Sequence, residues 1–301
     1  MSTAIAVQTP IMPVVNLVLN ALTSEHSRRA YERALVDFLD WHAQQGRPQL
    51  SKALVQAYKV ELQDAGLSSS TINLRLAAIR KLAVEAGDNG LLDPVLAQGI
   101  ARVKGVKSAG VRSGNWLTRE QAQRLLDSPD TTPLKGLRDR AILAILLGCG
   151  LRRGECSKLT FDHVQQRDGR WVICDLIGKG NRTRTVPMPS WAKSAIDAWA
   201  TAAALEDGRI FRSVRKGGYL AGNSMSAQAV ADVVHEHSRR CGFDIAAHDC
   251  RRSFARLAHK GGAGLDQIQL SLGHASIKTT EVYLGTEQSL TCAPCDVLGI
   301  K

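Results

Sequence analysis

The stretch that most limits how this chain can fold is residues 104–116, KGVKSAGVRSGNW. It contains glycine, serine and three basic residues but no acidic residue, which is typical of an exposed linker between packed units. A chain of 301 residues is long enough for about two domains. We therefore predict a flexible lead over 1–15, a domain over 16–104, a linker over 105–116, a second domain over 117–285 and a tail over 286–301.

The first predicted domain has the pattern of a small helical bundle. Apolar residues recur at helical spacing over 24–45, 51–65 and 70–86, and a glycine follows each stretch. Pro94 suits the first turn of a fourth helix, because that position needs no backbone N–H donor. We expect an all-helical domain.

The second predicted domain mixes helices with a small sheet. Thr118 and Gln121 have capping-box spacing, and the strongly apolar stretch Leu134 to Leu147 predicts a core helix. Gly178 to Asn181 indicates the turn of a hairpin. The predicted strands cover 171–177 and 183–188, and further helices cover 189–204, 226–241, 248–260, 264–272 and 276–284. The fold class is mainly α, with a small antiparallel sheet in an α+β second domain.

The balance of charge favours a polyanionic partner. The formal net charge is +11, of which residues 1–110 contribute +3 and residues 111–301 contribute +8. Nucleic acid is the commonest such partner, and a basic enzyme with another substrate is the alternative. The N-terminal stretch carries two prolines and no early basic residue, so we predict neither a signal peptide nor a membrane span.

The cysteines are consistent with a reducing compartment. An odd number, seven, is scattered along the chain, which favours free thiols in a cytosol over a disulfide framework. Cys292 and Cys295 form one C-x-x-C pair near the end. A single pair is weak evidence for zinc or redox chemistry, so we interpret it as incidental.

Several scattered side chains could together perform phosphoryl transfer without a metal. Arg152 follows the apolar helix, and Glu155 lies three residues on. The remaining candidates are Lys179 at a hairpin tip, His248 and Arg251 on one helical face, His274 after a glycine, and Tyr283. Each signal also has a plain structural explanation, such as an Arg–Glu pair, a solvated turn lysine, a capped helix with a basic face or a structural histidine.

The chemistry expected of this set follows from the residue types. A tyrosine phenol can attack phosphorus and hold it as a covalent ester. Arginines contact the non-bridging oxygens in a bidentate manner. A lysine can protonate the leaving alkoxide.

Four motifs carry a resemblance to a known family: GLRRGE, GKGNRTRTVPM, HDCRR and LGHASIKTTEVY. In order and spacing they resemble the tyrosine recombinase/integrase family over about residues 15–285. The resemblance implies that Arg152 and Arg251 clamp a phosphate and that Glu155 supports the first of them. It implies a general-acid role for Lys179 and a nucleophilic role for Tyr283. His248 and His274 match the two histidine positions of the family.

The resemblance also implies an activity. The expected protein is a site-specific recombinase, Xer-like or of transposon or phage type without an arm-binding domain. It would cut and rejoin double-stranded DNA through a 3′-phosphotyrosyl intermediate, with neither metal nor cofactor. Two rivals remain open: a nicking and resealing enzyme like type IB topoisomerases, and a non-catalytic DNA-binding regulator of the same fold. Arg252 stands where the family commonly has histidine.

The expected setting is a bacterial cytoplasm or nucleoid. The partners would be core sites with inverted repeats and further copies of the chain, as a homo-tetramer on synapsed DNA, with a free monomer left open. The tail, which contains Pro294, would dock on a neighbouring protomer. Basic side chains predicted to contact DNA, each with a solvated face as the alternative, are Arg75, Arg80, Lys81, Lys107, Arg112, Arg182 and Arg184.

Overall fold

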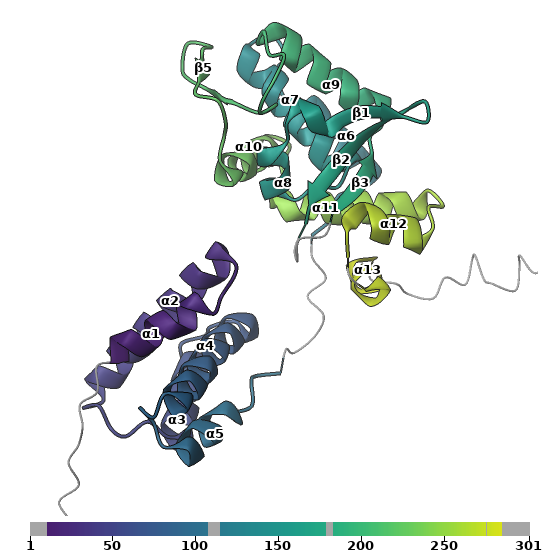
Figure 1. Cartoon of the computed structure of the whole chain (residues 1–301). Helices are drawn as coiled ribbons and strands as arrows, with labels where there is room; N and C mark the ends of the chain where they lie inside the picture. The colour runs from purple at the N-terminus through teal and green to yellow at the C-terminus, as the bar shows by residue number, and fades with distance from the viewer. Residues whose placement is uncertain (1–10, 108–114, 179–182, 275, 285–301) are drawn as a thin grey trace, which may run out of the picture. The chain divides into compact units, whose positions relative to one another are not determined.

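The chain folds as two compact units, Met1–Arg112 and Ser113–Lys301, and the division lies inside the stretch predicted as a linker. The computed structural model describes residues 11–107, 115–178, 183–274 and 276–284. Helices dominate both units (Figure 1). The tail over 286–301, with Cys292 and Cys295, lies outside the described residues. None of the described helices is both long and apolar enough to cross a membrane.

The first unit is a helical bundle, as predicted. Four of its described helices, α2 to α5, begin at polar residues whose side chains accept backbone N–H groups, such as Ser51 from Leu54 at 3.3 Å and Asp93 from Val95 at 2.8 Å. Apolar side chains from these helices form one core. The helices are α1 (Ile11–Asn20), α2 (Glu25–Gln44), α3 (Lys52–Asp64), α4 (Ser69–Asp88) and α5 (Pro94–Ala101).

The prediction of a flexible lead over residues 1–15 is wrong for its last five residues, which belong to α1. Pro13 lies in the first turn of this helix, where the missing N–H would have had no partner. Val14, Val15 and Val18 are buried in the core of the first unit, where α1 packs against α4. Burial of this apolar face therefore stabilises α1.

The second unit combines helices with two small antiparallel sheets. The predicted strands and helices are confirmed within a few residues, the two predicted strands pair antiparallel, and the stretch predicted as a core helix is α7; most of the predicted hairpin turn, residues 179–181, lies outside the described residues. The elements are α6 (Arg119–Asp127), α7 (Leu134–Gly148), α8 (Arg153–Lys158), a 3₁₀ turn (Phe161–His163), β1 (Val164–Arg167), β2 (Arg170–Ile177), β3 (Thr183–Pro187), α9 (Ser190–Ala202), β4 (Ser213–Val214), β5 (Leu220–Ala221), α10 (Ala227–Arg240), α11 (Ala247–Lys260), α12 (Leu265–Leu272) and α13 (Ile277–Leu284).

Strand β1 was not predicted. It pairs with β2, which pairs with β3, in the order β1-β2-β3. Asp168 and Gly169 join β1 to β2 with positive φ angles of 50° and 73°, the signs that a two-residue type I′ hairpin turn requires. The Asp-Gly pair was therefore a turn signal in the sequence.

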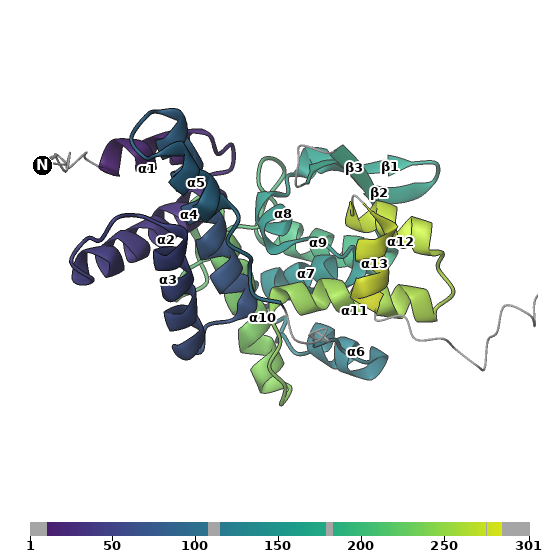
Figure 2. The same ribbon diagram turned by 90° about the horizontal axis from the view of Figure 1, so that it is seen from below.

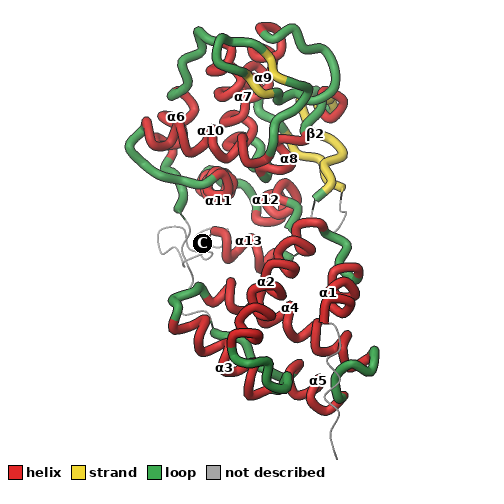
Figure 3. Tube along the Cα trace, turned by 90° about the vertical axis from the view of Figure 1, so that its left-hand side faces the viewer, coloured by secondary structure: helices red, strands yellow, loops and turns green. Residues whose placement is uncertain are grey.

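Packing in the second unit brings the described parts of the four motifs close together. Helix α7 packs against α9 and α11, and its stretch Ala141 to Leu146 is fully buried. Helices α11, α12 and α13 lie side by side (Figures 2 and 3), and α12 also packs against β3. A small apolar cluster that includes Leu272 and Leu284 holds these three helices together.

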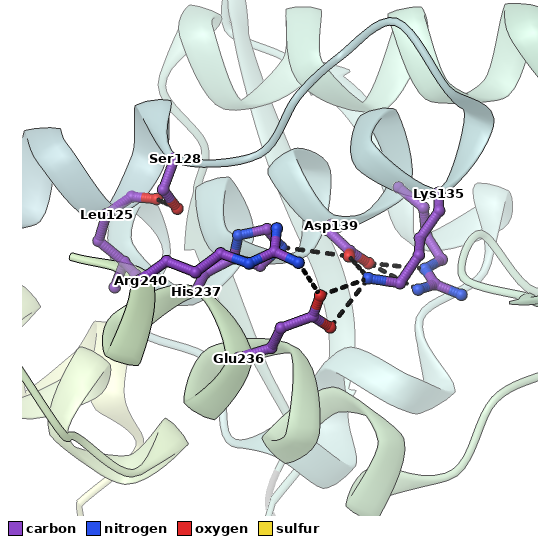
Figure 4. A network of polar contacts seen from close by, with 8 residues as sticks. Leu125, Ser128, Lys135, Asp139, Glu236, His237 and Arg240 are labelled. Carbon is purple, nitrogen blue, oxygen red and sulfur yellow. Dashed lines mark hydrogen bonds and ion pairs between the residues drawn. The ribbon is translucent and has the colours of Figure 1, made fainter. Parts of the chain in front are cut away.

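A buried polar network joins α7 to α10 (Figure 4). Asp139 is fully buried and accepts hydrogen bonds from Arg138 at 2.7 Å, Lys135 at 3.0 Å and His237 at 3.2 Å. Lys135 also pairs with Glu236 of α10 at 2.9 Å. Buried charges are tolerated only when they are paired in this way, so the network fixes how α10 packs on α7.

Replacing Asp139 with asparagine should destabilise the second unit by about 3 kcal/mol at pH 7, because breaking a buried ion pair strands the buried guanidinium of Arg138. Burial opposes ionisation of Asp139, but the hydrogen bond from His237 and the cations Arg138 and Lys135 prevail and lower its pKa. Its stabilisation is therefore present above the unfolded pKa of about 3.9 and lost as pH falls through the folded value.

Urea unfolding followed by circular dichroism would measure this loss. Asp197→Asn is a matched control, because it breaks a Lys193–Asp197 pair at the same helical spacing on an exposed surface. Such a pair contributes less than about 1 kcal/mol. Equal effects of the two substitutions would contradict a structural role for the buried network.

Candidate active site

Arg152 lies immediately before α8, where the chain leaves the buried helix α7. Its backbone N–H donates to Glu155 Oε2 at 2.8 Å, and its guanidinium donates to Glu155 Oε1 at 2.8 Å. The side chain of Arg152 is 32% exposed, whereas that of Glu155 is 9% exposed. The carboxylate thus holds the arginine from the buried side and leaves part of the guanidinium accessible to a ligand.

A second arginine, Arg184, also forms an ion pair with Glu155. Arg184 of β3 donates to both carboxylate oxygens of Glu155, at 3.0 and 2.8 Å, and its Nε donates to the carbonyl of Ser271 at 2.9 Å. Burial alone would raise the pKa of Glu155, but the hydrogen bonds and charges of Arg184 and Arg152 lower it to about 2. The carboxylate is therefore ionised at neutral pH.

Arg251 of α11 is fully buried and bridges two motifs. One of its terminal nitrogens donates to the carbonyl of Gly150 at 2.7 Å, and the other donates to the carbonyl of Leu272. Gly150 has φ of 61°, and a Cβ there would lie 2.6 Å from the ring of Phe254, so glycine is required. Because Arg251 has no exposed surface, direct contact with a ligand requires neighbouring side chains to move aside.

The two histidines lie close to these arginines. His248, in the first turn of α11, has its pKa lowered by burial of part of its ring and by the positive charges of Arg252, Arg251 and Arg152. His274 has its pKa lowered to about 4 by burial and then by Arg251, Arg152, His248 and Arg184. The mutual electrostatic influence of these groups indicates one cationic site.

His274 is placed by the turn between α12 and α13. Gly273 before it adopts φ of 64°, a left-handed conformation in which glycine carries no steric cost. The backbone N–H of His274 donates to the carbonyl of Gln269 at 3.2 Å, and its Nδ1 lies 3.0 Å from the hydroxyl of buried Thr280. Nothing in the sequence had pointed to Thr280.

The backbone of Tyr283 lies in α13, between the buried residues Thr280 and Leu284. Helix α13 packs on α11, which carries His248 and Arg251, and on α12, which ends just before His274. The predicted Lys179 and Arg182 lie outside the described residues, as does Arg112.

The predicted DNA-contacting residues have different surroundings. Arg75 is half-buried, with an ion pair to Asp37 at 2.6 Å, and Arg80 and Lys81 beside it on α4 are also half-buried. Lys107 is exposed. The side chain of Arg184 is 8% exposed and paired with Glu155, so contact with DNA would require this pair to rearrange.

Two family models match the chain: "Phage integrase family" over residues 115–289 and "Phage integrase, N-terminal SAM-like domain" over residues 16–89. The chain belongs to the phage integrase family. The four motifs of this integrase all lie within the first of these two matches.

Two relatives agree with this membership. Tyrosine recombinase XerC of Xylella fastidiosa strain M23 is 31% identical over 265 residues, 86% of each chain. XerC of Pseudomonas fluorescens strain Pf-5 is 30% identical over 266 residues, 86% of this chain and 85% of that one.

Two solved structures share the fold of the integrase. XerH recombinase bound to palindromic difH substrate has a TM-score of 0.70 at 20% identity, covering 91% of this chain and 80% of that one. A lambda integrase fragment, solved as a dimer bound to a COC′ core site, has a TM-score of 0.70 at 15% identity, covering 93% and 96%.

We expect the His274 ring to titrate near pH 4 in the integrase without DNA, well below the ordinary histidine value of about 6.5. Nuclear magnetic resonance of the ring protons across this range would measure it. Because the folded pKa is depressed, acidification from pH 6.5 towards 4 should destabilise the folded state. Arg152→Gln should raise the pKa of His274, whereas Arg167→Gln on exposed β1 should not. An ordinary value in the wild type would contradict the cationic site.

Proposed function

We propose that this integrase recombines DNA at specific sites, with Tyr283 as nucleophile and a pocket formed by Arg152, His248, Arg251 and His274. The observations that support the proposal are the contacts of Arg251 with the turns before Arg152 and His274, and the packing of α11, which carries His248 and Arg251, on α13, which bears Tyr283. Positive charge that is fixed where negative charge develops in a transition state is typically the largest catalytic contribution. A phosphodiester is the substrate that suits such a pocket.

The proposed step exchanges one ester bond for another. The phenol oxygen of Tyr283 attacks the phosphorus, a 3′-phosphotyrosyl bond forms, and the bond from phosphorus to the 5′ oxygen breaks. The phenol proton passes to a base, for which neutral His248 is suited because its lowered pKa leaves it unprotonated at pH 7. The 5′ oxygen takes a proton from Lys179. Attack by a 5′ hydroxyl of another strand reverses the sequence, so the bond energy is retained.

The proposed partner is double-stranded DNA with inverted-repeat core sites, bound by a homo-tetramer in a bacterial cytoplasm. The net charge of +11 supports a polyanionic partner. Similar folds have been solved with DNA, namely XerH with difH substrate and lambda integrase with a core site.

A strand-exchange assay tests the proposal. Duplexes with inverted half-sites are first selected by binding from a randomised pool. Two such sites on different molecules are then incubated with the protein in EDTA without ATP. Recombinant products joined at the selected site are expected. Relaxation of supercoiled DNA without exchange would instead indicate a topoisomerase-like enzyme, and binding without a covalent adduct would indicate a regulator.

A further inference from the structure

Arg184 connects three parts of the site through one side chain. It lies on β3, pairs with both oxygens of Glu155 beside α8, and donates to the carbonyl of Ser271 near the end of α12 at 2.9 Å. We propose that Arg184 is a positioning residue for DNA cleavage, which fixes Glu155 so that Arg152 points at the phosphate and sets the turn that carries His274. This inference rests on the proposed function.

The contacts with Glu155 explain why a second arginine is needed. Arg152 and Arg184 occupy the carboxylate together, with shortest distances of 2.8 Å in both pairs. Arg152 is 32% exposed, whereas Arg184 is 8% exposed. The buried arginine therefore anchors the carboxylate to the sheet, and the exposed arginine is held by that anchored group. Without the anchor, Glu155 could rotate with Arg152 and the guanidinium would no longer have a fixed direction.

The contact with the α12–α13 turn is a packing contact as well as a hydrogen bond. A Cβ added at Gly273 would lie 2.8 Å from Cδ of Arg184, so the backbone just before His274 rests directly on the stem of this arginine. Losing the hydrogen bond to Ser271 should let the turn shift and displace His274. Arg184 thus influences two groups of the proposed pocket, Arg152 through Glu155 and His274 through the turn.

The guanidinium shape is essential to this role. Its planar fork can face both oxygens of one carboxylate while its Nε bonds a third group. A lysine keeps the charge but has a single nitrogen, which cannot replace three contacts held in fixed directions. Arg184→Lys should therefore restore only part of what Arg184→Met removes.

The test is single-turnover cleavage of a nicked suicide duplex that carries the selected site, at saturating protein. We expect Arg184→Met to slow formation of the covalent adduct about 100-fold, the cost of a small misplacement of catalytic groups, and Arg184→Lys to lie between it and wild type. Arg167→Met, on exposed β1 of the same sheet, is the matched control and should cleave at the wild-type rate.

The pH profile and the binding data separate positioning from other roles. Arg184 lowers the pKa of both Glu155 and His274, so without Arg184 both groups should accept a proton at higher pH and the acid limb of the cleavage rate should move upward. DNA affinity and its salt dependence should be unchanged. A residue that contacts DNA would instead reduce the slope of log affinity against log salt by about 0.9, with an unshifted acid limb, and that result would overturn the proposal.

A second experiment, with a double substitution, applies if Arg184→Met does not fold. If Arg184→Met unfolds, Arg184→Lys is measured alone and together with Glu155→Gln, and adding Arg184→Lys should slow cleavage less in the Glu155→Gln protein than in wild type, because the two residues share one contact. Independent, multiplying losses would overturn the proposal. Failure of the proposed function is distinguishable, because wild type itself would then form no adduct. Normal cleavage by Arg184→Met would overturn only the positioning role.

Discussion

Tyr283→Phe should form no detectable covalent protein–DNA adduct. Phenylalanine keeps the ring but lacks the oxygen that would attack phosphorus, and loss of a catalytic nucleophile costs on the order of 10⁶ in rate. Helix α13 should still pack through Thr280 and Leu284, which are buried, so folding and DNA binding should persist. The measurement is a denaturing gel after incubation with the nicked suicide duplex.

The control for this prediction is another tyrosine of the same unit. The chain has four tyrosines, and Tyr219 is 71% exposed at the end of the β4–β5 turn region. Tyr219→Phe should form adduct at the wild-type rate. If Tyr283→Phe forms as much adduct as wild type, then Tyr283 is not the nucleophile and the proposed step is wrong.

Arg251→Ala should reduce adduct formation by at least about 10²–10³, the usual cost of removing a group that stabilises transition-state charge. The structure adds a second reason. Arg251 donates to the carbonyls of Gly150 and Leu272, so its loss leaves two buried acceptors unsatisfied and loosens the turns before Arg152 and His274. Arg251→Lys should be impaired as well, because one ammonium cannot span both carbonyls.

Arg256→Ala is the matched control on the same helix. Arg256 stacks on Trp116, with its guanidinium carbon 3.7 Å from the ring centroid, and it lies outside the proposed pocket. Its removal should leave single-turnover cleavage near wild type. Filter binding should show that Arg251→Ala still binds the duplex, since the proposed interface would contact many other phosphates. Cleavage by a folded, DNA-binding Arg251→Ala at the wild-type rate would contradict the role of Arg251.

The sequence predicted most helices and both long strands because their patterns are local. Capping residues, apolar spacing and glycine stops determine where the helices α3 and α4 begin and end, and the structure agrees within a few residues. Helix α1 was missed because two prolines interrupt this stretch of the sequence. It is helical because burial of Val14 and Val18 against the bundle outweighs these local signals.

The residues of the proposed site could be predicted from the sequence, but the contacts that hold them in place could not. Arg184 was one of the basic residues predicted to contact DNA. Alternation along β3 gave a contrary signal, since Arg184 and buried Val186 share a face of the strand. The pairing of Arg184 with Glu155 joins residues 29 positions apart, and one sequence has no feature that reveals such a contact.

The packing of α13 has a consequence for how several copies would work together. Leu284, next to Tyr283, is buried against Ala255, Ile268 and Leu272 of the same polypeptide, and only Gly273 to Ser276 separate α12 from α13. The backbone of the proposed nucleophile is therefore tethered to the helices that carry His248 and Arg251 of the same polypeptide. In the proposed reaction, each subunit would cut DNA with a tyrosine from its own chain, and assembly would align the cut strands without exchanging catalytic residues between subunits.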